Sequence, residues 1–520
     1  SDQTTATTTY GEINTWDVSQ ITDMSNLFYD KITFNSNIFG WNVSNVTSME
    51  NMFRQATVFN KPLGTWDVSN VTNINGMFRR ANAFNQNLSN WDISSLTSLN
   101  VVFAESPFMN GATTFEEEHP SLDWDVSQIT EMSHLFWRCS YNGDLSSWDV
   151  SNVTDMNNMF AQCSFNNSSI SNWNVSNVID MSYMFQWHTG FNIDISSWNV
   201  GNVTNMAGVF LKASSFNQDI SSWNPGNVTN MSHMFQDACS FNQDISNWDV
   251  SSVTSMERMF ANPDNCNVVG NSVFNQDLGS WDVSNVTDMS KMFQNAVSFD
   301  QSLSNWNVVN VTNMINMFDG VTLSQSNYDL TLGGWAALPS LQSNVNFHGG
   351  NSQYCDYSAR DILTDNYSWT ISDGGQDNDC IYYVFTTKSE LQTAVDLWVS
   401  DQTTAITTYG LIKLWDVSQI DDMSELFRDK TTFNSDISSW NVSSVSNMSA
   451  MFMDASSFNQ PLNQWDVSSV TSMSFMFNGS SNFNQDLSSW DVSSVADMES
   501  MFEGVTLSQS NYEATLNGWA

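Results

Sequence analysis

Apolar and polar positions along this chain of 520 residues repeat with a period of 25 residues. Tryptophans mark the period from Trp16 to Trp306 and again from Trp415 to Trp490, with one step of 24 residues and two of 33. One repeat, at 281–305, reads WDVSNVTDMSKMFQNAVSFDQSLSN. Sixteen such copies predict a stacked architecture, because a unit this short buries its apolar face only against its neighbours.

Each repeat, called a rung below, contains two local patterns. Around the tryptophan, Leu303, Trp306 and Val308 have the spacing of a short strand whose buried face includes Trp306 and Val308. The next apolar positions recur at three- and four-residue steps, which predicts a short helix with Thr287 as its N-cap. These positions are Val286, Met289, Met292, Phe293 and Ala296. We therefore expect an α/β repeat with one short parallel strand and one short helix per rung.

Two long segments occur twice and define the domains. Residues 1–16 recur almost unchanged at 400–415, and residues 317–336 recur at 501–520. The sequence thus predicts a long array at 1–336, a joint at 337–399 and a short array at 400–520, with the same start and stop. Within the joint, the amphipathic stretch 391–399 is placed to cover the first rung of the short array.

The start of the long array and the end of the short array have no such cover in the printed sequence, and an uncovered end exposes apolar surface and strand edge. Two readings stay open. Either flanking residues lie outside this sequence, or the end of one chain covers the start of the next and builds a head-to-tail fibre.

The repeats also resemble a known family. WDVSNVTDM at 148–156, SHMF at 232–235 and SFNQDIS at 240–246 are similar to the BspA-like leucine-rich-repeat surface proteins. The resemblance covers nearly the whole chain. It implies a leucine-rich-repeat-like right-handed solenoid, an exported location and a role in surface attachment, with no catalytic residues to transfer.

The cysteines form three neighbouring pairs. Cys139 and Cys163 occupy the same position in adjacent rungs, Cys239 and Cys266 also belong to adjacent rungs, and the remaining pair brackets the joint. That pair is Cys355 and Cys380. Because adjacent rungs are spaced suitably for a disulfide, we expect three disulfides and an oxidising compartment. Free thiols and a zinc site are the alternatives, although no C-x-x-C motif is present.

The charge balance restricts the partners. The chain has 55 Asp and Glu against 14 Lys and Arg, for a formal net charge of -41. Such a chain is repelled by nucleic acid and by anionic membrane surfaces, and no apolar run approaches the ~18 residues of a membrane-spanning helix. The five histidines are scattered, and no nucleophile or phosphate-binding motif occurs, so we expect no enzyme activity.

Carboxylates line up in two columns on the outer face. One column directly follows the tryptophans, as at Asp149 and Asp249. The other lies four residues before them, at Asp194, Asp219, Asp244 and Asp277. Carboxylates about 5 Å apart repel each other unless they are hydrogen-bonded or bridged. The sequence therefore leaves two readings, hydrogen bonds to turn amides or Ca²⁺ bound between rungs, with no other cofactor expected.

Three further features are candidates for surface contacts. Trp137 and Trp187 fall outside the period and could stack on a ligand, although core packing is the commoner role for such rings. Two insertions, at 111–120 and 261–270, could form contact loops or tolerated bulges. The repeat also creates N-x-S/T sequons, which predict glycans if the source is a eukaryote. The sequon asparagines are Asn45, Asn70, Asn152, Asn202, Asn227, Asn285 and Asn310.

These observations favour a non-catalytic extracellular structural and adhesive protein, in one form a fibre building block. The alternative is a monomeric recognition module that binds a host, matrix or glycan ligand. The expected partners are other copies end to end, or protein and glycan surfaces.

Overall fold

The computed structural model describes residues 3–108, 121–263, 272–377, 380 and 383–520. They form two compact units, Ser1–Gln376 and Asp377–Ala520. The boundary falls inside the joint expected at 337–399, so its two parts belong to different units. Unit 1 contains α1 (Gln3–Tyr10), η1 (Ile13–Thr15), η2 (Ser168–Ile170), α2 (Gln325–Ala336), β1 (Asn346–His348), α3 (Tyr357–Asp361), η3 (Ile362–Asn366) and β2 (Thr370–Ser372). Unit 2 contains α4 (Lys388–Ser400), α5 (Gln402–Tyr409), η4 (Ile412–Leu414) and α6 (Gln509–Trp519).

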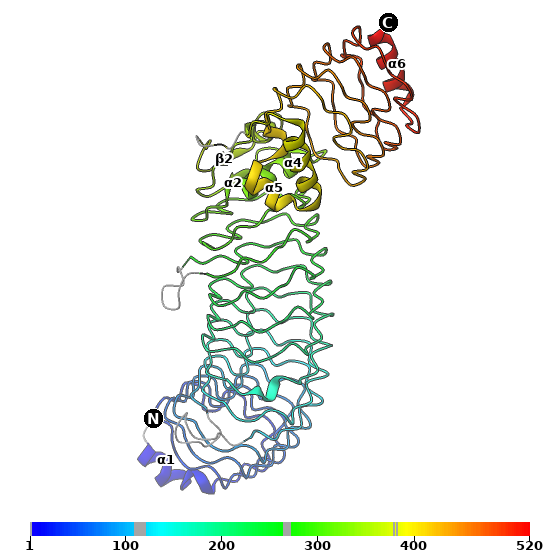
Figure 1. Cartoon of the computed structure of the whole chain (residues 1–520). Helices are drawn as coiled ribbons and strands as arrows, with labels where there is room; N and C mark the ends of the chain where they lie inside the picture. The colour runs from blue at the N-terminus through cyan, green and yellow to red at the C-terminus, as the bar shows by residue number, and fades with distance from the viewer. Residues whose placement is uncertain (1–2, 109–120, 264–271, 378–379, 381–382) are drawn as a thin grey trace. The chain divides into compact units, whose positions relative to one another are not determined.

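Consecutive rungs lie on one another in sequence order. One residue of each rung forms a parallel bridge with its equivalent in the next, as in the series Asp180, Asn205, Asn230 and Ser255. Figure 1 shows the successive turns of the chain one above another in the green part of unit 1. The bridges of unit 2 follow the same order, from Asp422 to Asp497. Each rung therefore has neighbouring rungs as its main packing partners.

The helix expected in each rung is not formed. The eight residues equivalent to Met289–Ala296, here called the turn ribbon, are a run of turns. Alternate backbone N–H groups donate to the next rung, as from Met289 to Asn313 O at 2.9 Å and from Phe293 to Met317 O at 2.9 Å. The N–H groups between them donate three residues back along the chain. The ribbon thus satisfies its backbone partly within the rung and partly with the next rung.

A left-handed backbone at two positions of every turn ribbon except that of Arg258, where only Arg258 is left-handed, breaks the helix. These positions are four residues apart, as at Lys291 with φ 58° and Asn295 with φ 57°. The right-handed helix excludes this conformation, which costs a non-glycine residue about 1–2 kcal/mol. Hydrogen bonds to the next rung compensate for that cost. The strand expected around each tryptophan is also absent, since those residues form turns and the bridge lies further on, at Asp288 in this rung.

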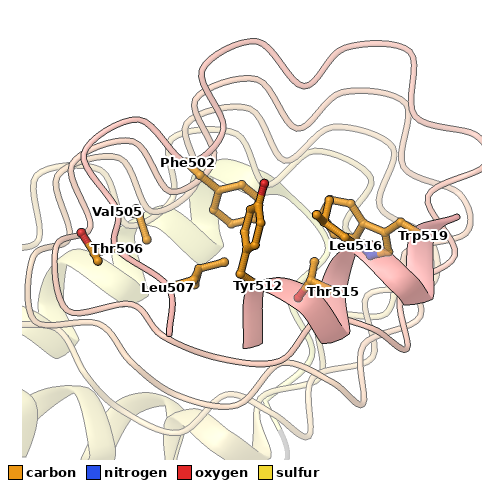
Figure 2. Close-up of a pocket in the computed structure, with 8 residues that line it drawn as sticks. All are labelled: Phe502, Val505, Thr506, Leu507, Tyr512, Thr515, Leu516 and Trp519. Carbon is orange, nitrogen blue, oxygen red and sulfur yellow. The ribbon is translucent and has the colours of Figure 1, made fainter. Parts of the chain in front are cut away.

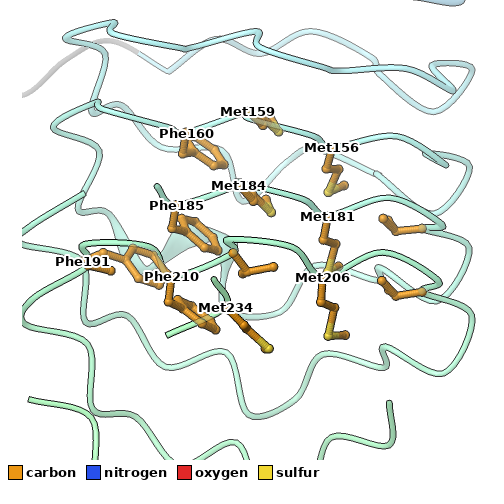
Figure 3. Packing of buried hydrophobic residues seen from close by; sticks show 14 of the residues in the cluster. Met156, Met159, Phe160, Met181, Met184, Phe185, Phe191, Met206, Phe210 and Met234 are labelled. Atoms are coloured by element: carbon orange, nitrogen blue, oxygen red, sulfur yellow. The ribbon is translucent and has the colours of Figure 1, made fainter. Parts of the chain in front are cut away.

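The core is built from columns of identical side chains. Figure 3 shows Met156, Met181 and Met206 in one column and equivalent phenylalanines in a second. Phe185 and Phe210 have ring centroids 6.0 Å apart with planes within 9°. In most rungs the buried tryptophan donates its indole N–H to a carbonyl of the preceding rung, as from Trp306 to Leu278 O at 2.8 Å. The apolar positions expected from the sequence are therefore the core positions, although the backbone that carries them differs.

The two parts of the joint cover array ends. In unit 1, β1 and β2 pair in parallel and Phe347 of β1 bridges Met314 of the last rung. In unit 2, α4 buries Leu391, Val395 and Trp398, and Gln392 donates to Leu426 O of the first rung at 3.0 Å. The amphipathic stretch at 391–399 therefore covers the first rung of the short array, as its pattern predicts.

Candidate binding surfaces

The carboxylate columns have turn amides as partners. Asp194 Oδ1 accepts the Ser196 backbone N–H at 3.0 Å, and Asp219, Asp244 and Asp277 make the equivalent contact at 2.8 to 2.9 Å. Hydrogen bonds from the Ser196 backbone and hydroxyl hold the pKa of Asp194 below its ordinary value. These bonds are those of an Asx-turn. Each carboxylate thus fixes the turn before its tryptophan.

The same geometry bears on the Ca²⁺ hypothesis. Among the described residues, no group of three or more His, Cys, Asp or Glu side chains is placed to hold a metal ion. Each column carboxylate already uses one oxygen for its own turn. The column after the tryptophans repeats the arrangement, because Asp149 accepts the Ser151 N–H at 3.0 Å and Asp249 accepts that of Ser251 at 3.1 Å. The columns therefore present ionised carboxylates that are oriented by the rung.

The sequon asparagines form a ladder of hydrogen bonds from rung to rung. The Nδ2 atom that a glycosyltransferase modifies donates to a carbonyl of the preceding rung, from Asn202 to Ser176 O and from Asn227 to Gly201 O, both at 2.7 Å. The same bond joins each of the others, Asn45, Asn70, Asn152, Asn285 and Asn310, to its preceding rung at 2.7 to 2.8 Å. These asparagines lie at the exposed surface and tie rungs together. Asn152, Asn177, Asn202 and their neighbours line a shallow groove of 500 Å³.

Trp137 and Trp187 lie on the outer side of the turn ribbon. Trp187 occupies a left-handed position with φ 58°, which turns its side chain outward and leaves it 47% exposed. Lys212 Nζ lies 3.8 Å from its ring centroid. Trp137 is half-buried, with the Arg138 and Arg79 guanidinium carbons 5.1 and 5.9 Å from its ring. Both rings are outside the core, and both carry a cation on the face that a ligand would use.

The cysteine expectations have different outcomes. Cys355 and Cys380 form a disulfide. Cys239 is disulfide-bonded, and its expected partner Cys266 lies outside the described residues.

Cys139 and Cys163 are free thiols, so the disulfide expected between them is not formed. Their sulfur atoms point to different backbone carbonyls, Cys139 to Phe108 O at 3.5 Å and Cys163 to Phe160 O at 3.0 Å. Burial raises the pKa of Cys139 to about 12 and also raises that of Cys163. Although the two positions are equivalent in adjacent rungs, their side chains are directed at different groups and not at each other. The neutral, buried thiols are poor nucleophiles and act as small apolar side chains.

The insertions expected to be contact loops fall largely outside the described residues. The first, 111–120, lies entirely outside them, and of the second, 261–270, only 261–263 are described. Within the described residues, no helix combines the length and apolar character needed to cross a bilayer.

The chain matches the sequence profile of one protein family in five overlapping or successive segments. The matches cover residues 2–115, 106–192, 161–272, 265–332 and 385–515. No curated protein is significantly similar to the chain. The repeated matches extend over most of both units and leave out mainly the residues of the joint. They also support the repeat character expected from the resemblance to BspA-like proteins at this coarser level. The chain belongs to DUF285, a family described as Mycoplasma protein of unknown function.

Proposed function

We propose that the protein is a non-catalytic extracellular structural and adhesive repeat protein, and that its stacked rungs form a solenoid scaffold. The observation that carries the proposal is that apolar side chains of a rung are buried between rungs while its polar side chains point outward. Aromatic and methionine side chains, as at Trp223, Met231 and Phe235, are at most 3% exposed. The outward positions hold oriented Asp, Asn, Ser and Thr side chains. A rung of this kind displays polar groups at a fixed spacing.

The repeated display suits attachment through many weak contacts. Hydrogen bonds from Ser221 and Ser246 lower the pKa of Asp219 and Asp244, so these carboxylates are ionised at neutral pH. Equivalent carboxylates recur at the rung spacing, and a surface with repeated cationic or polar groups can engage several of them together. Simultaneous engagement multiplies individually weak affinities. This mechanism requires no reacting group, which is the basis for proposing a non-catalytic role.

The proposed extracellular location rests on the cysteines. The Cys355–Cys380 disulfide and the bonded Cys239 are stable in an oxidising compartment.

An adhesion assay tests the proposal. The purified chain would be applied to immobilised matrix proteins, to a glycan array and to cell monolayers, with heat-unfolded chain as the control. A variant with Asp194→Asn, Asp219→Asn and Asp244→Asn keeps the Asx-turn acceptors and removes three charges. We expect binding by the folded chain that this variant reduces several-fold. Equal binding by folded and unfolded chain on every surface would contradict the proposal.

A second candidate is recognition by a single site around Trp187, because this ring is exposed beside Lys212. A ring with an adjacent ammonium group suits a sugar that bears a carboxylate or sulfate group. Replacing Trp187 by Ala would then abolish binding, while the three Asp→Asn changes would leave it intact.

A further inference from the structure

The structure contains the same array end twice, once with residues 338–376 packed against it and once without an equivalent segment among the described residues. Residues 317–336 end the array of unit 1, and residues 501–520, which are nearly identical, end that of unit 2. In α2, Tyr328, Leu332 and Trp335 are 0% exposed. Their equivalents in α6 include Tyr512 at 55% and Leu516 at 50% exposed. The open copy is therefore an apolar surface whose covered form is known from the same chain.

The open surface is hollowed. Figure 2 shows side chains from the last rung and from α6 gathering around it. The hollow has a volume of 420 Å³. Its apolar lining is made of Phe502, Val505, Leu507, Tyr512, Leu516 and Trp519. We call this surface the α6 face.

Residues 338–376 show what covers such a face. Phe347 of β1 lies 5.3 Å from the Trp335 ring in an edge-to-face contact and 6.1 Å from Phe318. The Trp369 ring lies 6.3 Å from that of Trp335. The Tyr328 hydroxyl donates to Asp373 Oδ2 at 3.0 Å. The strand β1 with Phe347, together with Trp369 and the acceptor Asp373 on either side of β2, thus completes the end of unit 1.

Backbone groups contribute to the same fit. The Phe318 N–H of the last rung donates to His348 O at 3.0 Å. At the equivalent edge of unit 2, the N–H groups of Ser500, Phe502 and Gly504 have no backbone acceptor within the described residues. A strand like β1 supplies carbonyls to this edge. The α6 face is accordingly both apolar and rich in donors.

A carboxylate that holds residues 338–376 in unit 1 has a counterpart in α6. In unit 1, Asp329 accepts the backbone N–H groups of Cys355 and Asp356 at 3.0 to 3.1 Å. Glu513 holds the equivalent place in α6, and Gln509 donates to it at 2.9 Å, as Gln325 does to Asp329. The α6 face therefore keeps a carboxylate acceptor for the segment's backbone.

A further complete rung cannot stack on this face. The helix α6 already occupies the position that the tryptophan-containing half of that rung would take. Between rungs, the Leu462 carbonyl accepts the indole N–H of Trp490 from the following rung at 2.9 Å. At the end, Trp519 of α6 donates to the equivalent Leu487 O at 2.9 Å, and Asn511 donates to Asn484 O at 2.8 Å. The position of the tryptophan-containing half of a further rung is thus filled by α6. Only the turn-ribbon half at 498–504 remains open.

From this juxtaposition we propose that the α6 face is a binding site for a segment with the chemistry of residues 338–376: a short parallel strand carrying a phenylalanine, followed by a tryptophan and an aspartate. The segment pairs with the turn ribbon at 498–504 and packs on Tyr512, Leu516 and Trp519. A first rung from another copy of the chain is not the occupant, because it requires the half that α6 fills.

The test attaches a second copy of residues 337–376, with its cysteine changed to Ser, directly after Ala520 of the full chain. Hydrogen exchange of residues 498–519 is measured by mass spectrometry, together with the melting temperature of unit 2. We expect at least a tenfold slowing of exchange at Phe502, the equivalent of Phe318, whose N–H donates to His348 O in unit 1, and a higher melting temperature. A copy carrying Phe347→Asp and Trp369→Ser is the matched control and should give neither effect.

A second variant separates binding from folding. Leu516 is half-exposed, so Leu516→Lys leaves the unextended chain folded and its exchange unchanged. In the extended chain it should abolish the protection. Unchanged exchange at 498–519 on attachment, or protection that survives Leu516→Lys, overturns the proposal. Protection of the unextended chain that grows with protein concentration also overturns it, because a second copy would then be the occupant.

Discussion

Truncating one phenylalanine inside the array tests the mutual shielding of the rungs. Phe210 is fully buried, with ring centroids 3.9 Å from Phe216, 6.0 Å from Phe185 and 5.5 Å from Phe235. Because it packs against rungs on both sides, Phe210→Ala removes contacts that the neighbours cannot replace. A large-to-small change of this kind costs about 3–5 kcal/mol.

The matched control is Phe28→Ala in the first rung of the same unit. Phe28 stacks on Phe34 at 3.9 Å and on Phe53 of the following rung at 5.4 Å, and among the described residues no phenylalanine that precedes it stacks on it. Its truncation should therefore cost less, about 2 kcal/mol.

The assay is native-state hydrogen exchange, which resolves local opening along a repeat array. In Phe210→Ala, exchange should rise in the mutated rung and in the rungs of Phe185 and Phe235. In Phe28→Ala, the increase should be confined to the first two rungs. If Phe210→Ala costs less than about 1 kcal/mol, or if only its own rung is affected, the reasoning about mutual shielding is wrong.

Two further predictions concern the ribbon and the columns. Gly208 has φ +59°, and an added Cβ would lie 2.3 Å from the Tyr183 ring. Gly208→Ala should therefore destabilise unit 1, measured by urea unfolding, by more than the ~1 kcal/mol that a left-handed alanine costs. Adding Tyr183→Ala should recover only the part of the loss that comes from the steric clash. Asp219 and Asp244 have folded pKa values below those of the unfolded chain. The stabilisation that these two carboxylates give is therefore complete above about pH 4 and is lost as the pH falls through the folded pKa values. The urea midpoints at pH 5 and pH 2.5 should differ less in the Asp219→Asn, Asp244→Asn variant than in the unchanged chain. An equal difference in both would show that these carboxylates do not contribute to the pH dependence of stability.

The period and the core were predictable because each depends on residue type at a fixed spacing. Trp281, Met289 and Phe293 are fully buried, as their recurrence predicts. The turn ribbon was missed because apolar positions at three- and four-residue steps fit both a helix and alternating turns. A usable signal was present, since Gly208 and Gly320 stand where other rungs place polar residues such as Asn158 and Asn295, and a helix interior disfavours glycine.

The candidate sites were less predictable. That the column carboxylates hydrogen-bond to turn amides was one of the two readings open from the sequence, because Ser follows Asp at the spacing of an Asx-turn. The separation of Cys139 from Cys163 depends on the direction of two side chains, which position in the repeat does not determine. The two nearly identical segments do not by themselves distinguish the exposed Leu516 from the buried Leu332; that expectation came from residues 337–399, which follow only the first copy in the printed sequence.

Cysteine crosslinking between rungs tests the stacking order most directly. Asn205 and Asn230 form a parallel bridge, and Ser255 is the next member of the series. Equivalent Cα atoms lie about 4.8 Å apart in adjacent rungs and about 10 Å apart two rungs away, while a disulfide spans up to about 6.8 Å. Under mild oxidation, with peptide mapping by mass spectrometry, Asn205→Cys with Asn230→Cys should crosslink within one chain, and Asn205→Cys with Ser255→Cys should not. Equal crosslinking of both pairs, or crosslinking of the second pair alone, would contradict the stacked arrangement.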